Sequence, residues 1–331
     1  MFIIETYSAA VFLCFITMLC WGSWANAQKL AASTWRFELF YWDYVLGIVL
    51  FTFLLGITLG SNGEAGRSFF SDLSQASNEY LGSAFIGGII FNLANILLVA
   101  AIAIAGMSVA FPVGIGLALV IGVIVNYIDA PLGNPVILFA GVACVAAAIV
   151  LNAYAFRLKS AAAQKTSTKG LIIALIAGSL MGLFYKYVAN SMAPDFAQPE
   201  PGKLTPYTAL FIFSIGILVS NFIFNSVLMR FPVSGEPVSV SQYFGGQFKS
   251  HLAGIIGGCI WSMGMSFSIL ASEKAGPAIS YGLGQGATVI AALWGIYVWK
   301  EFAGSSLRVH RLLHLMLGLY IIGLIIIIIS R

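Results

Sequence analysis

Long apolar stretches separated by short polar gaps run through the whole chain. Each stretch is about 20 residues long, which is enough for a helix to cross the hydrocarbon core of a bilayer. The segments are residues 6–29, 42–60, 81–105, 108–128, 134–156, 169–190, 207–229, 250–271, 276–299 and 312–330. This pattern predicts an all-α polytopic membrane protein with ten transmembrane helices.

The composition agrees with this reading. The chain is 60% hydrophobic and 8% charged, with a mean hydropathy of +0.96, whereas soluble domains carry about 25% charged residues. We therefore expect the lipid bilayer as the surroundings. The net charge of +4 is carried by the polar gaps and does not indicate nucleic acid as a partner.

The basic residues are concentrated in alternate gaps. Eleven of the sixteen lysines and arginines follow the odd-numbered segments: Lys29, Arg36, Arg157, Lys159, Lys165, Lys169, Arg230, Lys249, Lys300, Arg308 and Arg311. Short loops rich in Lys and Arg stay in the cytoplasm. The chain is thus predicted to lie in the cell (inner) membrane with both termini on the outer side.

The two halves of the chain resemble each other. A shift of 170 residues lays Gly87 on Gly257 and Gly88 on Gly258, and it also superposes Gly106 on Gly276, Gly114 on Gly284, Gly116 on Gly286 and Tyr127 on Tyr297. Five helices per unit is an odd number, so the second copy must enter the membrane from the opposite side. We predict two inverted five-helix repeats, residues 1–160 and 161–331, joined by the basic segment 157–169, with a solute site at their interface.

Polar side chains within the spans are the candidate binding groups, because an unbonded polar group is costly in lipid. Asn92 and Asn95 lie one turn apart on one helix, and Tyr281, Gln285 and Thr288 form a stripe on another. Either set forms hydrogen bonds between helices or lines a cavity. Trp24 on the first span, and Trp261 and Ser262 on the eighth, are further candidates for the cavity wall.

Charged groups are rare inside the spans. Lys186 is the only charge well within one, and it either extends to the surface or faces the cavity. Carboxylates occur only near span ends, and Asp43 and Glu301 are the best candidates among them for a coupling-proton site.

Motifs of enzymes are absent from the sequence. It has no phosphate-binding loop, no nucleophile elbow and no HExxH motif. Cys14, Cys20, Cys144 and Cys259 all fall within apolar segments, without the spacing of a metal site. We expect no enzymatic activity, no cofactor and no metal.

Several short motifs resemble one group of transporters. Gly106-Met107-Ser108, Lys169-Gly170-Leu171 and Lys300-Glu301 resemble L-rhamnose permeases. The motifs that resemble plant ureide permeases are Gly22-x-Trp24, Phe69-Phe70, Leu73-Ser74-Gln75, Gly87-Gly88, Asn95 and the run Ser108, Val109, Ile121, Gly122, Asn126 and Tyr127. Ala25 stands where ureide permeases have proline, and Lys186 has no counterpart. The chain thus resembles the drug/metabolite transporter superfamily, in the branch of ten-helix sugar (glucose/ribose and L-rhamnose type) and ureide permeases.

The resemblance implies a secondary active transporter that takes up a small polar solute, a sugar or a ureide-like compound, by alternating access with protons as the coupling ion. It implies a site in which Trp24, Trp261 and Tyr281 offer ring faces and Asn92, Asn95, Lys186, Ser262 and Gln285 bind polar groups. Two alternatives remain at this point: an exporter of drugs or amino acids on the same scaffold, and a membrane scaffold without transport activity.

Overall fold

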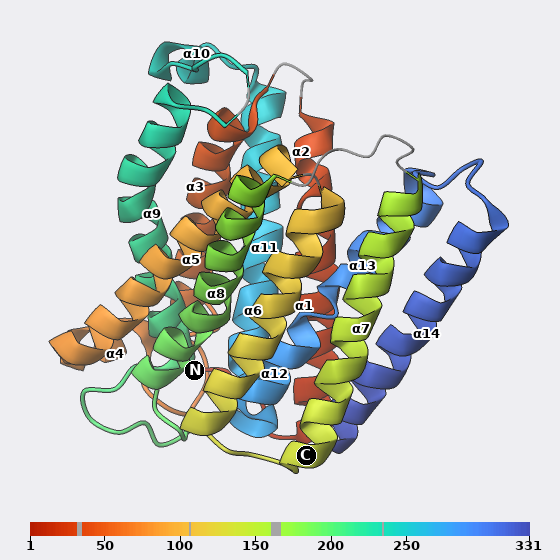
Figure 1. Cartoon of the computed structure of the whole chain (residues 1–331). Coiled ribbons are helices and arrows are strands. Elements are labelled where there is room, and N and C mark those ends of the chain that lie inside the picture. Colours follow the sequence, from red (N-terminus) through yellow and green to blue (C-terminus); the bar gives the residue numbers. More distant parts are fainter. Residues whose placement is uncertain (32–34, 106, 160–166, 234) are drawn as a thin grey trace.

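The computed structural model describes residues 1–31, 35–105, 107–159, 167–233 and 235–331, and it is almost entirely helical (Figure 1). The helices are α1 (Tyr7–Ser23), α2 (Asn26–Leu30), α3 (Phe37–Ile57), α4 (Phe69–Gln75), α5 (Asn78–Ala105), α6 (Met107–Asp129), α7 (Pro135–Lys159), α8 (Thr168–Ser191), α9 (Pro206–Arg230), α10 (Val240–Phe244), α11 (Phe248–Ala275), α12 (Pro277–Gly284), α13 (Ala287–Leu293), the π-helix η1 (Trp294–Val298) and α14 (Leu307–Ile329). Within these described ranges the only β pairing is one bridge between Met192 and Leu204.

The spanning helices form because lipid offers no partner to backbone N–H and C=O groups, so each apolar segment must bond within itself. In the described part of the chain, nine helical spans are long and apolar enough to cross a membrane, and α6 holds a shorter apolar stretch, Val113–Asp129. Each of the ten predicted segments coincides with a helix or a broken helix. The prediction of an all-helical, multi-pass membrane protein is confirmed. Gly106 and residues 160–166 of the predicted join lie outside the described residues.

The first and ninth spans are not the continuous helices that the sequence predicts. The first divides into α1 and α2 at Trp24 and Ala25. The ninth divides into α12, α13 and η1. At Gly286, Thr288 and Val289 the backbone N–H donates to the carbonyl three residues earlier, in place of the carbonyl four residues earlier that an α-helix uses. Broken helices inside a membrane protein are tolerated where the backbone lines a cavity.

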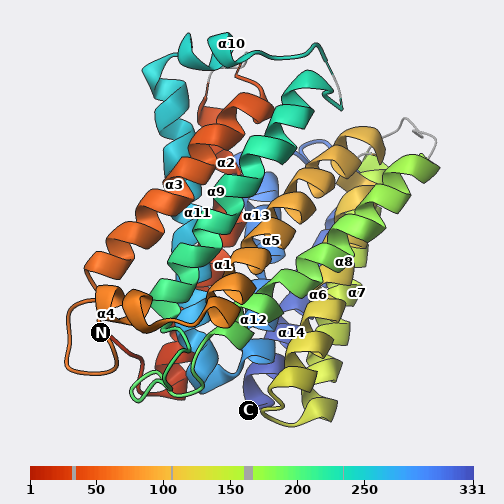
Figure 2. The same ribbon diagram turned by 90° about the vertical axis from the view of Figure 1, so that its left-hand side faces the viewer.

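The bundle has two distinct ends (Figures 1 and 2). Both chain termini, α4 and the loop of residues 192–205 lie at one end, which we call the terminal end. The short helices α2 and α10 and the loop of residues 299–306 lie at the other end, which we call the basic end because it carries the Lys- and Arg-rich gaps.

Helix contacts come in matching pairs. In the first pair, α1 packs against α11 and against α12–α13, and α8 packs against α5 and α6. In the second pair, α3 packs against α11, and α9 packs against α5. The glycines of the sequence repeat lie at two of these crossings. A Cβ on Gly88 would collide with the Phe213 carbonyl on α9, and a Cβ on Gly258 would collide with the Tyr44 carbonyl on α3. Small residues thus let the backbones approach closely, which is a main source of helix association in lipid.

Candidate solute-binding cavity

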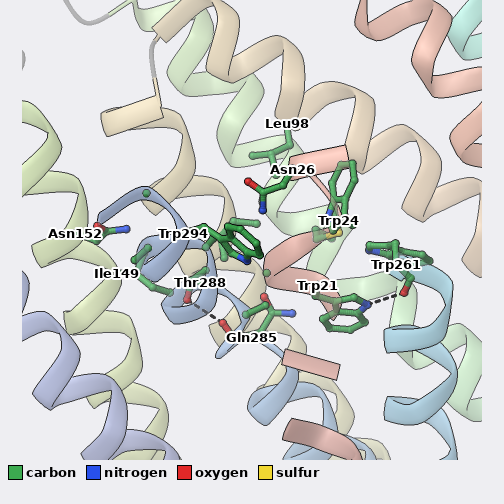
Figure 3. A pocket seen from close by; sticks show the side chains of 18 of the residues that line it. Trp21, Trp24, Asn26, Leu98, Ile149, Asn152, Trp261, Gln285, Thr288 and Trp294 are labelled. Carbon is green, nitrogen blue, oxygen red and sulfur yellow. Dashed lines mark hydrogen bonds between the residues drawn. The ribbon is translucent and has the colours of Figure 1, made fainter. Parts of the chain in front are cut away.

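A cavity of about 310 Å³ lies in the centre of the bundle. Its lining runs from Met181 and Phe184 on α8 to Trp299 and Glu301 at the basic end, so the cavity opens toward that end. The other residues that line it come from six spans, including the breaks in the first and ninth: Trp21, Gly22, Trp24, Ala25, Asn26, Phe91, Asn95, Leu98, Ile115, Ile149, Asn152, Ala153, Phe156, Trp261, Gln285, Ala287, Thr288, Ala291, Ala292, Trp294 and Gly295. Figure 3 shows many of these side chains converging on the same space.

Aromatic rings form much of the wall. Trp21 stacks on Trp261 with ring centroids 6.0 Å apart and donates from Nε1 to the Trp261 carbonyl at 3.2 Å. Phe91 packs against Trp261 at 4.3 Å, and Trp24 packs against Tyr44 at 4.8 Å. These contacts hold the tryptophan rings in place, so the cavity presents rigid flat faces.

Amide and hydroxyl groups are set between the rings. Asn95 on α5, Asn152 on α7 and Gln285 at the break of the ninth span all line the cavity, and Figure 3 labels the last two. Asn95 donates from Nδ2 to the Tyr41 hydroxyl at 3.1 Å, which fixes its amide. The Oδ1 atom of Asn152 is buried and has no hydrogen-bond partner among the described residues. A buried acceptor without a donor is costly, so a donor on a solute would stabilise it.

The break in the ninth span brings two polar residues into the wall. Thr288 Oγ1 donates to the Gln285 carbonyl at 2.9 Å, and the same carbonyl accepts the Thr288 backbone N–H at 3.2 Å. Just beyond, Trp294 Nε1 donates to Ser23 Oγ at 2.8 Å and Trp299 Nε1 donates to Asn26 Oδ1 at 2.6 Å. These two bonds tie the ninth span to the broken first span at the mouth of the cavity.

Four of the eight residues predicted for the site line this cavity, namely Trp24, Asn95, Trp261 and Gln285. The other four, Asn92, Ser262, Tyr281 and Lys186, are not part of its lining. Each of them has a different set of contacts.

Asn92 bonds helices together. It is fully buried, accepts a hydrogen bond from the Tyr41 hydroxyl at 2.9 Å and donates to Ser220 Oγ at 2.9 Å. It thus joins α3, α5 and α9, although it lies only one turn from Asn95. Ser262 is also buried, and its hydroxyl faces the Ile48 carbonyl of α3 at 3.4 Å.

Tyr281 closes the cavity on the side of the terminal end. Its hydroxyl donates to the Met181 carbonyl at 3.1 Å, and its ring lies 5.2 Å from Tyr185, whose hydroxyl bonds Ser268 and Ser280. Phe184 packs on both tyrosines. We call Phe184, Tyr185 and Tyr281 the aromatic floor, because they fill the bundle below the cavity.

Lys186 lies at the terminal end. Its Nζ is 2.9 Å from Asp129 Oδ2, and Asn190 donates to the same carboxylate at 3.1 Å. The Lys186 side chain keeps 34% of its surface exposed, so the ion pair is in contact with solvent and contributes little to stability. Lys186 directly follows Tyr185 of the floor on α8, but its side chain pairs with Asp129 and is not part of the cavity lining.

Sequence reasoning missed three groups of the lining. Asn152 is the one strongly polar residue in the middle of an apolar helix, and that isolation was an available signal. Trp299, at the end of the ninth span, lines the cavity mouth. Trp294 enters the wall at the first residue of the π-helix, a change of helix type that no sequence pattern indicates.

A second polar cluster lies at the basic end, around Asp43. This carboxylate is 2% exposed; Tyr243 on α10 donates to its Oδ1 at 2.7 Å, and Nδ1 of His251 lies 2.9 Å from its Oδ2. Burial and the adjacent Asp43 carboxylate raise the pKa of Tyr243 well above its ordinary value, so its hydroxyl stays protonated as a donor. Among the described residues, no group of three or more His, Cys, Asp or Glu side chains is arranged to hold a metal ion.

Comparison with known proteins identifies the family. The ureide permease family model matches residues 40–169 and 157–330, which together span most of the chain. The chain belongs to the ureide permease family. Membership in this family of transporters and the apolar helices together make it a multi-pass membrane transport protein.

The curated relatives are similar over their whole length. Ureide permease 1 of Arabidopsis thaliana is 24% identical, with 98% of this chain and 97% of the relative covered. Probable ureide permease A3 of Vigna unguiculata is 21% identical, with 93% and 99% covered. A solved crystal structure of another protein superposes with a TM-score of 0.64 at 17% identity, covering 98% of this chain and 99% of that one. At this identity the likeness shows the fold alone.

Proposed function

We propose that this protein takes up a small polar solute of the ureide or sugar type by alternating access. The observation that carries the proposal is the central cavity, in which rigid indole faces alternate with amide groups. Cavities of about 300 Å³ or more suit small ligands when a few polar groups fix their orientation. The relatives are named as ureide permeases, which favours a ureide over a sugar.

The chemistry of the lining suits a flat solute that both donates and accepts hydrogen bonds. A ureido group offers N–H donors and a carbonyl acceptor on a planar frame. In our proposal Trp24 and Trp261 pack on its faces, the Asn152 oxygen accepts an N–H, and the Asn95 and Gln285 amides complete the polar contacts. The other four predicted residues act around the site. Asn92 and Ser262 bond neighbouring helices together, Tyr281 is part of the floor, and Lys186 belongs to the ion pair at the terminal end.

The alternating-access mechanism rests on two inverted repeats, residues 1–160 and 161–331. Matching helix contacts support it, as do the equivalent crossings at Gly88 and Gly258. If the basic end faces the cytoplasm, as its Lys and Arg residues favour, both termini face outward and the cavity is open inward. The aromatic floor then closes the path to the outside, and transport requires the floor to open as the mouth closes.

Protons are the coupling ion in this proposal, with Asp43 and Glu301 as candidate carriers. Asp43 is buried beside His251 near the basic end, and Glu301 lines the cavity mouth. The cell (inner) membrane is the proposed location, because Lys and Arg are concentrated in alternate gaps of the chain.

Counterflow in proteoliposomes tests the function. Purified protein is reconstituted, and trans-acceleration of labelled allantoin by unlabelled allantoin or L-rhamnose is measured with and without a proton gradient. Acceleration by either solute, increased by an inward proton gradient, supports the proposal. Acceleration by amino acids alone would indicate an exporter, and no exchange with any solute would contradict a transport function.

A further inference from the structure

A second hollow, of about 410 Å³, lies at the terminal end of the bundle. It is formed where α6 and α8 end and where α11 passes into α12, and its polar lining consists of Asp129, Asn190, Lys203, Ser272 and Glu273. We call it the outer vestibule. It shares no lining residue with the central cavity, and the buried Tyr185 and Tyr281 of the aromatic floor lie along α8 and α12 between the residues that line the two hollows.

Glu273 is the unusual residue of the outer vestibule. Its side chain is 8% exposed, and its Oε1 pairs with Lys274 Nζ at 2.7 Å. Its Oε2 is buried and has no hydrogen-bond partner within the described residues. A buried carboxylate oxygen without a donor costs free energy, so the vestibule lacks a hydrogen-bond donor at this point.

The other charges of the vestibule already have partners. Asp129 pairs with Lys186 and accepts from Asn190, and Lys203 pairs with Glu200 at 2.8 Å. Each carboxylate therefore faces a lysine, and no excess negative charge remains to attract a cation. What Glu273 Oε2 lacks is a neutral donor such as an N–H group.

We propose that the outer vestibule is a second binding site for the transported solute, in which Glu273 Oε2 accepts an N–H of a neutral ureido group. The inference rests on the proposed function, because the solute is the same one. Since the vestibule lies on the far side of the floor from the cavity, solute bound here is captured before the floor opens. The site therefore governs uptake from the terminal end and not the affinity of the central cavity.

Equilibrium dialysis of the purified full chain with radiolabelled allantoin tests the site. We expect two equivalents bound per chain in the wild type, one in Glu273→Gln and two in Lys274→Gln. Lys274→Gln is the matched control, since it removes the same ion pair and keeps the carboxylate. Gln285→Ala is expected to weaken the other equivalent and to leave the Glu273-dependent one unchanged.

Uptake kinetics give a second readout. Loss of one charge-assisted hydrogen bond predicts an increase of about tenfold or more in the apparent KM of Glu273→Gln for solute added at the terminal end. The kcat is expected to change little, because the central cavity is intact.

The outcomes separate this inference from the proposed function. One equivalent of allantoin bound by the wild type, or equal losses of binding in Glu273→Gln and Lys274→Gln, would overturn the vestibule site. The proposed function would still stand if the wild type transports the solute. The wild-type stoichiometry decides the question even if a variant does not fold. Absence of both binding and transport in the wild type would overturn the function and the vestibule site together.

Discussion

At the scale of single residues, two amides one helical turn apart have different roles. Asn92 is fully buried and bonds to Tyr41 and Ser220, whereas Asn95 reaches the cavity wall and bonds to Tyr41 only through its Nδ2. The spacing places both on one side of α5, but the packing of α3 and α9 decides which one meets the cavity.

Replacing each asparagine separately distinguishes these roles. Asn92→Ala leaves the Tyr41 hydroxyl and Ser220 short of a partner, so it is expected to destabilise the protein by about 1–3 kcal/mol. Asn95→Ala is expected to raise the apparent KM for uptake with a smaller loss of stability. Thermal unfolding in detergent and uptake by proteoliposomes measure the two effects, and a larger thermal shift in Asn95→Ala would contradict the assignment.

Asn152 and Gln285 provide a sharper test of the cavity. Because Asn152 Oδ1 has no partner in the described structure, Asn152→Ala removes no internal bond and is expected to leave the melting temperature unchanged or slightly higher. Loss of one solute hydrogen bond should raise the apparent KM several-fold, since such bonds are worth about 0.5–1.5 kcal/mol. Gln285→Ala should likewise raise KM more than it alters stability. Normal uptake by both variants would remove the amides from the site.

At the scale of elements, the broken ninth span forms part of the cavity wall, and the aromatic floor fills the bundle below it. Tyr281 fits against α6 only because Gly122 has no side chain: a Cβ there would collide with the Tyr281 ring. In the sequence Gly122 belongs to a motif that resembles ureide permeases, and the structure specifies Tyr281 as the residue that packs against it.

Two glycines on α6 form a matched pair for mutation. Gly122→Ala forces Tyr281 to move and is expected to cost about 1–3 kcal/mol by overpacking. The control, Gly116→Ala, meets only Ile149 at 3.9 Å and is expected to be neutral or to stabilise by about 0.5–1 kcal/mol through reduced backbone entropy. Thermal unfolding of the two variants checks this, and equal melting temperatures would show that the floor tolerates displacement of Tyr281.

At the scale of the whole molecule, the proposed mechanism depends on which end faces the cytoplasm. The loop that contains Asn62 lies at the terminal end, and the loop that contains Ala303 lies at the basic end; both residues are exposed. The bias of Lys and Arg toward the basic end predicts that it is cytoplasmic.

Cysteine labelling in intact cells measures this orientation. A membrane-impermeant maleimide is expected to react with Asn62→Cys in intact cells and with Ala303→Cys only after permeabilisation. Wild-type protein provides the background from the four native cysteines. The reverse pattern would invert the orientation and make the described state open to the outside.

The sequence by itself determined the fold class, because the length and spacing of apolar segments reflect what a bilayer requires of each helix separately. It also determined the pattern of glycines at helix crossings, and it indicated Trp24, Asn95, Trp261 and Gln285 as candidates. Only the tertiary structure decided that Asn92, Ser262 and Tyr281 face neighbouring helices, that Lys186 pairs with Asp129, and that Asn152 and Trp294 enter the cavity wall. The physical reason is that membrane insertion depends on local hydrophobicity, whereas the direction of a polar side chain depends on neighbours that are distant in the chain and on breaks that rotate one helical segment relative to the next.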